Sequence, residues 1–308
     1  MIACDARCEL YLPDKEYPAS VRQLASPPPV LYVRGNVSVF NLPMLAIIGS
    51  RRASPYGLAL AEMAAKIAAE SGVAVVSGGA RGCDQAAGRS ALSAGGKHVM
   101  VLGTGADVAY PSSVRPLIER TLKGGGAVVS IEPWGTPPMR WAFPKRNRVI
   151  AALSSAVLVT EAGLPSGTFS TAEAAEELGR EVLAVPGSFF SPESRGSNYL
   201  IANGACCISD EEALEVAISR IFGTLRFERG GSAGVPGLDS QSKRVLDMLV
   251  ANPMRLEDIA LALRMGGSEC MQLMGELEVA GAVERLVDGR FSPSKTALHA
   301  LTHLGHNG

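Results

Sequence analysis

Hydrophobic residues occur in short, nearly unbroken runs that are separated by glycine-rich turns. A strand covered by helices on both faces shows such a run, because it has no solvent-facing side for polar residues. The pattern therefore predicts buried strands at residues 45–48, 73–76, 98–102, 127–131, 156–160, 182–185 and 205–208.

Helical segments lie between these runs. The clearest one has apolar residues every three or four positions from Leu60 to Ala68, with charged residues on the opposite stripe. Ser54 followed by Pro55 is typical of a helix start, since serine caps the first amides and proline has a helical φ. Because strands and helices alternate, residues 45–222 are predicted to form an α/β fold with a doubly wound, mostly parallel, Rossmann-like sheet.

The pattern changes at both ends of this core. Residues 1–44 contain consecutive prolines and are predicted to be an N-terminal extension, irregular or a hairpin, that packs on the core. Residues 223–239 are rich in glycine and are predicted to be a linker.

The C-terminal residues have a helical pattern of their own. Three short helices are predicted at 242–250, 256–263 and 268–280, followed by a hairpin around Asp288 and Gly289. This order indicates a small winged-helix domain over residues 240–291. Residues 292–308 are predicted to be a flexible tail.

Composition restricts the class of function. With 29 Lys+Arg and 30 Asp+Glu the net charge is −1, so nucleic acid cannot be bound by bulk charge and needs a local cluster. The apolar runs are far shorter than the ~20 residues of a membrane helix, and charges interrupt the first residues where a signal peptide needs an apolar stretch. The six cysteines lack the spacing of zinc ligands. We therefore expect a cytoplasmic protein with free thiols, without metal or cofactor and without membrane association.

Candidate chemistry lies in the loops that follow the strands, because ligands of open α/β sheets bind at the carboxyl ends of the strands. Glycine-rich loops follow the first, second, third and fifth runs, at residues 49–52, 77–82, 103–105 and 166–168. Glycine lets the backbone approach an anion, and the next helix offers free amides and a positive dipole end. One such loop is typical of a tight turn, whereas four on one edge favour a site for several phosphates.

A cationic cluster follows the fourth run. It contains Arg140, Lys145, Arg146 and Arg148, with Trp141 and Phe143 between them. Guanidinium groups bind phosphate oxygens and aromatic rings stack on bases, although the same residues could form a solvated helix start with Phe143 in the core. Four acids also fall near this edge, so the local charge depends on which way their side chains point: Asp84, Asp107, Glu132 and Glu161.

The sequence lacks the usual motifs of an enzyme of this fold. It has no nucleophile elbow, no P-loop and no dinucleotide fingerprint after the first run. His98, the one histidine outside the predicted tail, begins a strand and is expected in the core. These observations predict a binding protein and not an enzyme.

Several motifs together resemble the DNA-processing protein A family (DprA, also called Smf). They are AIIGSRRASPYG from Ala46, VVSGGARGCD from Val75, VLGTGADVAYP from Val101, FPKRNRVIAALS from Phe143, EAGLPSGTFSTA from Glu161 and GREVLAVPG from Gly179. The resemblance implies a cytoplasmic, non-catalytic protein that binds and protects single-stranded DNA, loads the RecA recombinase in natural transformation or recombination, and forms a homodimer. By resemblance, the strand-binding residues are Ser50, Arg51, Arg52, Gly78, Arg81, Gly82, Phe143, Lys145, Asn147, Arg148, Ser166, Gly167 and Thr168.

The chain departs from the family pattern in several places. The family usually has a large apolar residue at the position of Gly79, a histidine at Gly88, an asparagine at Val114 and an apolar residue at Ser170. We therefore expect the floor of the crevice to differ from that of the family. The helical N-terminal domain of many relatives is expected to be absent.

An alternative function is a nucleotide-binding enzyme or sensor of the same fold. The loop at Pro165–Thr168 resembles that of nucleotide phosphoribohydrolases, in which a glutamate follows the threonine by three residues. Here that position is Thr171, which argues against this chemistry.

The predicted winged-helix module has an acidic balance. Between residues 240 and 291 acidic residues outnumber basic ones, and the expected recognition helix carries glutamates without lysine or arginine. A helix that enters the major groove needs cations for the phosphates. The hypothesis is that this module contacts protein or regulates the core and does not read duplex DNA.

Overall fold

The computed structural model describes residues 6–224, 240–251, 254–285 and 289–294. The chain divides into two units, Met1–Glu228 and Arg229–Gly308. Most of the predicted linker, most of the predicted tail and the turn residue Asp288 lie outside the described residues.

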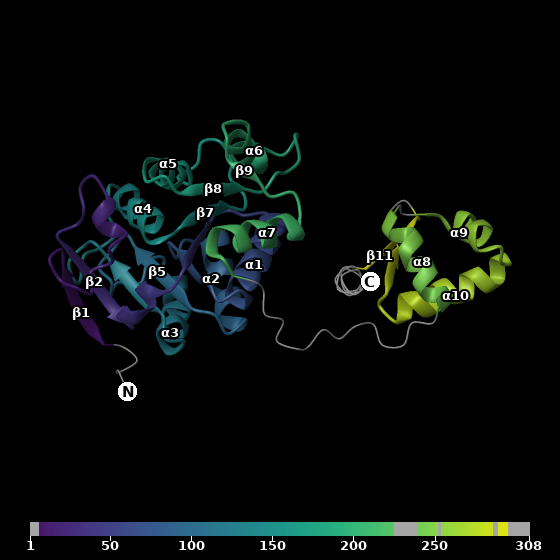
Figure 1. Ribbon diagram of the computed structural model, residues 1–308, viewed down its shortest axis with the longest axis horizontal. Coiled ribbons are helices and arrows are strands. Elements are labelled where there is room, and N and C mark those ends of the chain that lie inside the picture. The colour runs from purple at the N-terminus through teal and green to yellow at the C-terminus, as the bar shows by residue number, and fades with distance from the viewer. Residues whose placement is uncertain (1–5, 225–239, 252–253, 286–288, 295–308) are drawn as a thin grey trace. The chain divides into compact units, whose positions relative to one another are not determined.

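The first unit contains a nine-stranded sheet with the order β1-β2-β6-β5-β4-β3-β7-β8-β9 (Figure 1). Strands β3 to β9 run parallel to one another and correspond to the seven predicted runs, which confirms the doubly wound sheet. Their bounds are β3 Met44–Ile48, β4 Ala74–Ser77, β5 His98–Leu102, β6 Ala127–Ser130, β7 Ala156–Val159, β8 Glu181–Ala184 and β9 Cys206–Cys207.

The N-terminal segment is part of the sheet. Strands β1 (Arg7–Tyr11) and β2 (Val30–Gly35) form an antiparallel hairpin, and β2 pairs antiparallel with β6. Of the two predicted alternatives the hairpin is present, and it adds two strands to the core. Only alternate residues of β2 are fully buried, Leu31 and Val33 among them, so one face of this strand lies against the core.

Helices cover both faces of the sheet (Figure 1). One face packs against α4, α5 and α6, and the other against α1, α2, α3 and α7. The helices are α1 Pro55–Glu70, α2 Cys83–Ser93, α3 Arg115–Lys123, α4 Ala142–Leu153, α5 Phe169–Glu177, α6 Arg195–Ala202 and α7 Glu211–Phe222, with short 3₁₀ segments at Val21–Gln23, Val37–Asn41, Ser112–Val114 and Pro192–Ser194.

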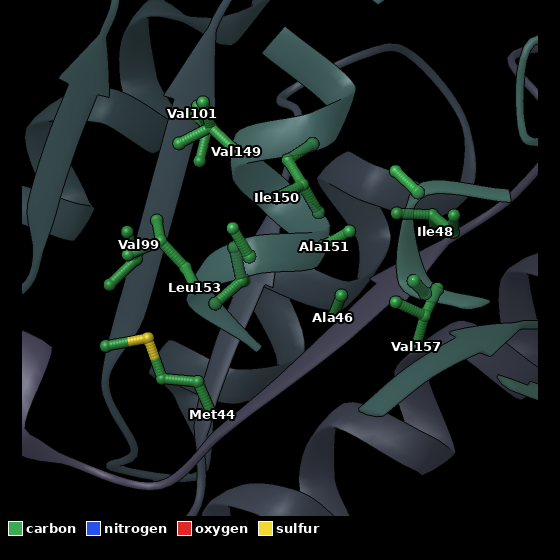
Figure 2. Packing of buried hydrophobic residues seen from close by; sticks show 14 of the residues in the cluster. Met44, Ala46, Ile48, Val99, Val101, Val149, Ile150, Ala151, Leu153 and Val157 are labelled. Atoms are coloured by element: carbon green, nitrogen blue, oxygen red, sulfur yellow. The ribbon is translucent and has the colours of Figure 1, made fainter. Parts of the chain in front are cut away.

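Helix α4 rests on the centre of the sheet. Figure 2 shows Val149, Ile150 and Leu153 of α4 packed against side chains of β3, β5 and β7. All three helix residues are at most 7% exposed. Their spacing defines the buried stripe of α4, and this packing fixes which way the polar residues of the same helix point.

Helix α1 begins as predicted. Ser54 is the N-cap, its hydroxyl accepts a hydrogen bond from the Gly57 amide at 3.1 Å, and Pro55 occupies the first helical position. The buried stripe is turned slightly from the predicted one, since Ala61 and Ala65 are buried whereas Leu60 and Met63 lie at its border. Small residues on this stripe allow α1 and α2 to pack closely.

The second unit has its own core, formed by residues such as Leu246, Ile259, Met274 and Phe291. It contains three helices followed by a two-stranded antiparallel sheet, which confirms the predicted winged-helix arrangement. The elements are α8 Ser240–Ala251, α9 Leu256–Leu263, α10 Gly267–Val279, β10 Val283–Arg285 and β11 Phe291–Pro293. None of the helices in the described ranges combines the length and apolarity that crossing a membrane requires.

His98 lies in the core, as expected. It is 0% exposed, and its ring nitrogens are hydrogen-bonded to Ser77 Oγ at 3.0 Å and Thr121 Oγ1 at 2.8 Å. Burial lowers the pKa of His98 from 6.5 to about 3, so the imidazole is neutral in the folded protein at neutral pH.

The buried imidazole predicts acid sensitivity. Between pH 6.5 and about 3 the unfolded chain binds a proton at His98 that the folded chain does not, so stability falls as the pH is lowered through this range. We expect the free energy of unfolding to drop by up to about 1.4 kcal/mol per pH unit relative to the variant His98→Gln. Urea unfolding of both proteins across this range measures the difference, and parallel curves would contradict the prediction.

Candidate nucleic-acid interface

The site lies where the order of the parallel strands reverses. β3 has β4 on one side and β7 on the other, and the chain continues outward from both. Ligand crevices of open α/β sheets form at such a point, between the loops that leave the two central strands. A cleft of about 720 Å³ opens there, between the loop after β3, the start of α4 and the loop from β7 to α5.

The structure brings most of the predicted site residues to this cleft. Its lining includes Ser50, Arg51, Arg52, Phe143, Asn147, Ser166, Gly167 and Thr168. The other predicted residues lie elsewhere: Lys145 and Arg148 line a neighbouring groove between α4 and α5, Arg81 is exposed on the loop after β4, and Gly78 and Gly82 shape that loop.

Gly82 allows two loops to approach each other closely. Its φ is +80°, and a Cβ at this position would lie 2.2 Å from the carbonyl oxygen of Ser50. The next residue, Cys83, donates its amide to the same oxygen at 3.2 Å. We therefore assign Gly82 a supporting role, which holds the loop after β3 in place.

Arg146 is buried and does not face the edge of the cleft as a free cation. Its side chain is 4% exposed, and its guanidinium donates hydrogen bonds to the carbonyl oxygens of Gly78 and Val101. Its Nε also donates to the Asn147 side chain at 3.1 Å. The cationic cluster predicted from the sequence is therefore wrong at Arg146, which ties α4 to the ends of β4 and β5.

Helical spacing explains this orientation. Arg146 stands three, four and seven residues before Val149, Ile150 and Leu153, so it belongs to the buried stripe of α4. Lys145 and Arg148 are three residues apart and share the opposite, exposed side. This periodicity was the signal in the sequence that could have identified the buried arginine.

Asp84 is the acidic neighbour of Arg146 beneath the cleft. It is 6% exposed, and its carboxylate accepts a hydrogen bond from the Gly78 amide at 2.9 Å. Burial raises the pKa of Asp84, and attraction by Arg146 opposes that rise. In turn, burial lowers the pKa of Arg146 to about 10, against the attraction of Asp84, so the guanidinium keeps its charge at neutral pH.

Glu161 occupies the N-terminus of α1. Its carboxylate is 2% exposed and accepts hydrogen bonds from the amide of Ser54, at 2.9 Å, and from its hydroxyl. A Cβ on Gly57 would meet this carboxylate at 2.6 Å. The expectation that this helix offers free amides to a phosphate is therefore wrong, because a carboxylate of the protein already binds there.

The acids near this edge point inward or are paired. Glu132 is buried like Asp84 and Glu161, and Asp107 accepts a hydrogen bond from the Gly135 amide at 2.8 Å and forms an ion pair with Arg7. The exposed side chains that line the cleft include Arg51, Arg52 and Arg140. The cleft therefore presents positive charge to the solvent although the chain as a whole is slightly negative.

Aromatic rings accompany these cations. The Arg51 guanidinium lies 5.6 Å from the centroid of the Phe143 ring, which is 6.0 Å from the Tyr110 ring. Lys145 Nζ lies 4.6 Å from the centroid of the Trp141 ring, and the Trp141 side chain is half exposed. Tyr110 and Arg140 also line the cleft, although neither is among the predicted strand-binding residues; Tyr110 belongs to the motif that begins at Val101 and Arg140 to the predicted cationic cluster.

The loop between β7 and α5 is positioned by side-chain hydrogen bonds. Asn147 Nδ2 donates to Ser170 Oγ at 2.8 Å and to the Gly167 carbonyl oxygen at 3.3 Å. The Ser166 hydroxyl accepts from the Thr168 amide at 3.2 Å. Gly167 is exposed, and a Cβ there would touch nothing within 4 Å, so its backbone is open to a ligand.

The departures from the family pattern lie mostly below the cleft. A Cβ on Gly79 would approach Val114 and Met100, and one on Gly88 would lie 2.8 Å from the His98 ring. At both positions the side chain of a larger neighbour fills the space that a side chain in place of the glycine would occupy. Ser170 differs, because it lines the cleft itself.

A matched pair of variants tests the role of Arg146. Arg146→Ala removes the donors to two carbonyl oxygens and leaves Asp84 without its counter-charge, so we expect a loss of about 3–5 kcal/mol in the free energy of unfolding. Arg148→Ala breaks only an exposed ion pair with Glu177, at 3.5 Å, and is expected to cost less than about 1 kcal/mol. Equal effects of the two substitutions in urea unfolding would contradict the assignment.

Comparison with known proteins identifies the family of this chain. Residues 9–218 match the family model described as DNA recombination-mediator protein A, and residues 232–289 match the DprA winged helix domain. Protein Smf of Escherichia coli (strain K12) is 40% identical over 200 residues, which cover 65% of this chain and 54% of that protein. The chain spans about half the length of the Smf relatives that it matches.

Solved structures show the same architecture. DNA processing protein A from Streptococcus pneumoniae has a TM-score of 0.63 at 35% identity, with 68% of this chain and 73% of that chain covered. A structure of DNA processing protein A from Helicobacter pylori, described for its single-stranded DNA binding mode, has a TM-score of 0.63 at 29% identity, with 69% and 97% covered. Because the first family model alone covers more than half of the residues, the chain belongs to the DNA recombination-mediator protein A family.

Proposed function

We propose that this chain is a non-catalytic recombination mediator that binds single-stranded DNA in the cleft at the switch point of its sheet. The observation that carries the proposal is the separation of charge at this edge. Arg51, Arg52 and Arg140 are exposed at the cleft, whereas Asp84 and Glu161 are buried and hydrogen-bonded. Such a surface attracts a phosphate backbone.

The aromatic rings favour a single strand over a duplex. Tyr110 and Trp141 are each about half exposed, beside Phe143 and Lys145. The bases of a single strand are free to stack on such rings, whereas those of a duplex are stacked on each other. We therefore expect binding with little preference for sequence.

The carboxyl groups near the cleft that could act as a general acid or base are buried or lie outside it. Among the described residues that line the cleft, the sole carboxylate is Asp84, which is buried against Arg146 and the Gly78 amide. Thr171, at the position of the phosphoribohydrolase glutamate, is 2% exposed, and Glu173 lies in the neighbouring groove. This arrangement favours the binding function over the alternative of a nucleotide hydrolase.

The finer parts of the function follow from the family. We propose that the bound strand is protected and handed to the RecA recombinase, in natural transformation or another recombination task, in the cytoplasm. We further propose a homodimer as the working form.

The proposed role of the winged-helix unit is contact with protein. Its third helix, α10, exposes Glu269, Glu276 and Glu278, together with the apolar Met271 and Val279. Carboxylates on a recognition helix repel the phosphates of a major groove.

The phosphate contacts predict a salt dependence. Five cations line the cleft and its neighbouring groove: Arg51, Arg52, Arg140, Lys145 and Arg148. If each meets one phosphate, a plot of log K against log salt for oligothymidine has a slope of about −3.5. Arg52→Ala is expected to reduce the slope by about 0.7 and to weaken binding equally for oligothymidine, oligodeoxyadenosine and mixed sequences.

Fluorescence anisotropy of labelled strands measures both quantities. The matched control is Arg120→Ala, which removes an exposed arginine from the last turn of α3. This turn directly precedes β6, so it lies near the amino ends of the parallel strands, whereas the cleft lies at their carboxyl ends. This control is expected to bind like the unsubstituted protein. A slope near zero, or a loss confined to one sequence, would refute the proposal.

The acidic recognition helix predicts weak duplex binding. Residues Arg229–Gly308 form a unit with its own core, and this fragment is expected not to bind a blunt duplex with micromolar affinity at physiological salt. Anisotropy of a labelled duplex measures this, with circular dichroism to verify that the fragment is helical. Micromolar affinity would refute the assignment of this unit to protein contacts.

A further inference from the structure

Two adjacent phenylalanines stand in solvent beside the cleft. Phe189 and Phe190 are 83% and 86% exposed, and they lie in the loop between β8 and α6. Their ring centroids are 5.3 Å apart with an interplanar angle of 89°, so one ring stands edge-on to the other. A single exposed apolar residue is common on a protein surface, but two adjacent rings exposed to this degree indicate a binding role.

The loop that carries them is held at its base. Two hydrogen bonds join Asn198 of α6 to Gly187, each at 3.0 Å: Oδ1 accepts from the Gly187 amide, and Nδ2 donates to the Gly187 carbonyl oxygen. The Tyr56 hydroxyl donates to the Pro186 carbonyl oxygen at 2.8 Å. The exposed rings therefore stand on an anchored base, which lowers the entropic cost of binding a partner.

The loop is also continuous with the cleft. β8 pairs parallel with β7, so the loops that follow the two strands leave the same edge of the sheet. Gly196, just after the phenylalanine loop, donates its amide to the Ala162 carbonyl oxygen at 2.7 Å. A Cβ on Gly163, which lines the cleft, would lie 3.3 Å from the Pro192 carbonyl oxygen, two residues beyond Phe190.

We propose that Phe189 and Phe190 are a stacking platform for bases of the same single strand whose phosphates the cleft binds. The inference rests on the proposed function and extends the strand path from the β7 loop to the β8 loop. Every base has a π-face, so such a platform binds without sequence preference. The exposed Arg195, at the first position of α6, is a cation close to the two phenylalanines in sequence, and a guanidinium there can bind a phosphate of the DNA strand.

The test compares normal and abasic strands on the full chain. Abasic strands keep the phosphates but have no bases to stack. The double variant Phe189→Ala/Phe190→Ala is expected to bind oligothymidine at least about fivefold more weakly than the unsubstituted protein, and to bind the abasic strand equally well. Phe189→Tyr/Phe190→Tyr, which keeps both rings, is expected to restore binding of oligothymidine.

Two controls separate this inference from the proposed function. Tyr11→Ala removes a half-exposed aromatic side chain from β1, which is the outermost strand at the far end of the strand order from β8, and is expected to leave both affinities unchanged. Arg51→Ala/Arg52→Ala is expected to weaken normal and abasic strands alike.

Each remaining outcome overturns one of the two proposals. If the phenylalanine variant binds oligothymidine normally while the arginine variant does not, the stacking platform is refuted and the cleft is retained. If the phenylalanine variant loses affinity equally for the normal and the abasic strand, base stacking is also refuted. If instead it no longer forms a dimer in sedimentation while its DNA affinity is unchanged, base stacking is refuted and the two phenylalanines contact a second copy of the chain. If the unsubstituted protein binds neither strand, the proposed function itself is refuted.

Discussion

The buried guanidinium of Arg146 is the interaction on which the cleft depends. It reaches from α4 to the carbonyl oxygens of Gly78 and Val101, at the ends of two adjacent strands, and it also contacts Asn147. Asn147 in turn holds the loop between β7 and α5. A buried charge is tolerated only where hydrogen-bond acceptors and an opposite charge surround it. Those acceptors fix the floor of the cleft, and the loops above it therefore have a rigid support.

The same requirement sets the sign of the charge at the surface. Asp84 and Glu161 point inward and accept hydrogen bonds, Asp84 from the Gly78 amide and Glu161 from the amide and the hydroxyl of Ser54, and Arg146 also attracts the Asp84 carboxylate. Asp84 is the one carboxylate among the described lining residues, and it is buried, so Arg51 and Arg52 meet no exposed acid there. A chain with a net charge of −1 can thus present a local anion-binding surface, because the acid that lines the cleft is buried whereas Arg51, Arg52 and Arg140 are exposed.

The sheet was largely predictable from the sequence, whereas the geometry of the site was only partly so. Unbroken apolar runs identified β3 to β9, since strands buried on both faces need no polar residues. β2 was predicted only as part of an irregular segment or a hairpin, because it follows consecutive prolines and lies outside the alternation of parallel strands and helices. The rule for strand ends identified the loops after β3 and β7, which line the cleft, whereas the predicted loop after β4 contributes only Ala80 and residues 103–105 after β5 are not among the lining residues. The contact of Glu161 with Ser54 did not, because it joins residues that are 107 positions apart.

The positions at which we expect this chain to depart from the family pattern lie mostly in the support of the cleft and not on its charged surface. Gly79 faces Val114 and Gly88 faces His98, so each smaller residue is matched by a neighbour that fills the space. Because a core is closely packed, a change of volume at one residue requires a compensating change at its neighbour. The hydrogen bonds of Arg146 connect α4 to the strand ends below the cleft. Ser170 is the departure that reaches the site: its hydroxyl donates to the Gly167 carbonyl oxygen at 2.9 Å and accepts from Asn147. An apolar residue at this position could make neither bond, so the Ser170 hydroxyl is part of the side-chain network that positions the exposed Gly167 backbone.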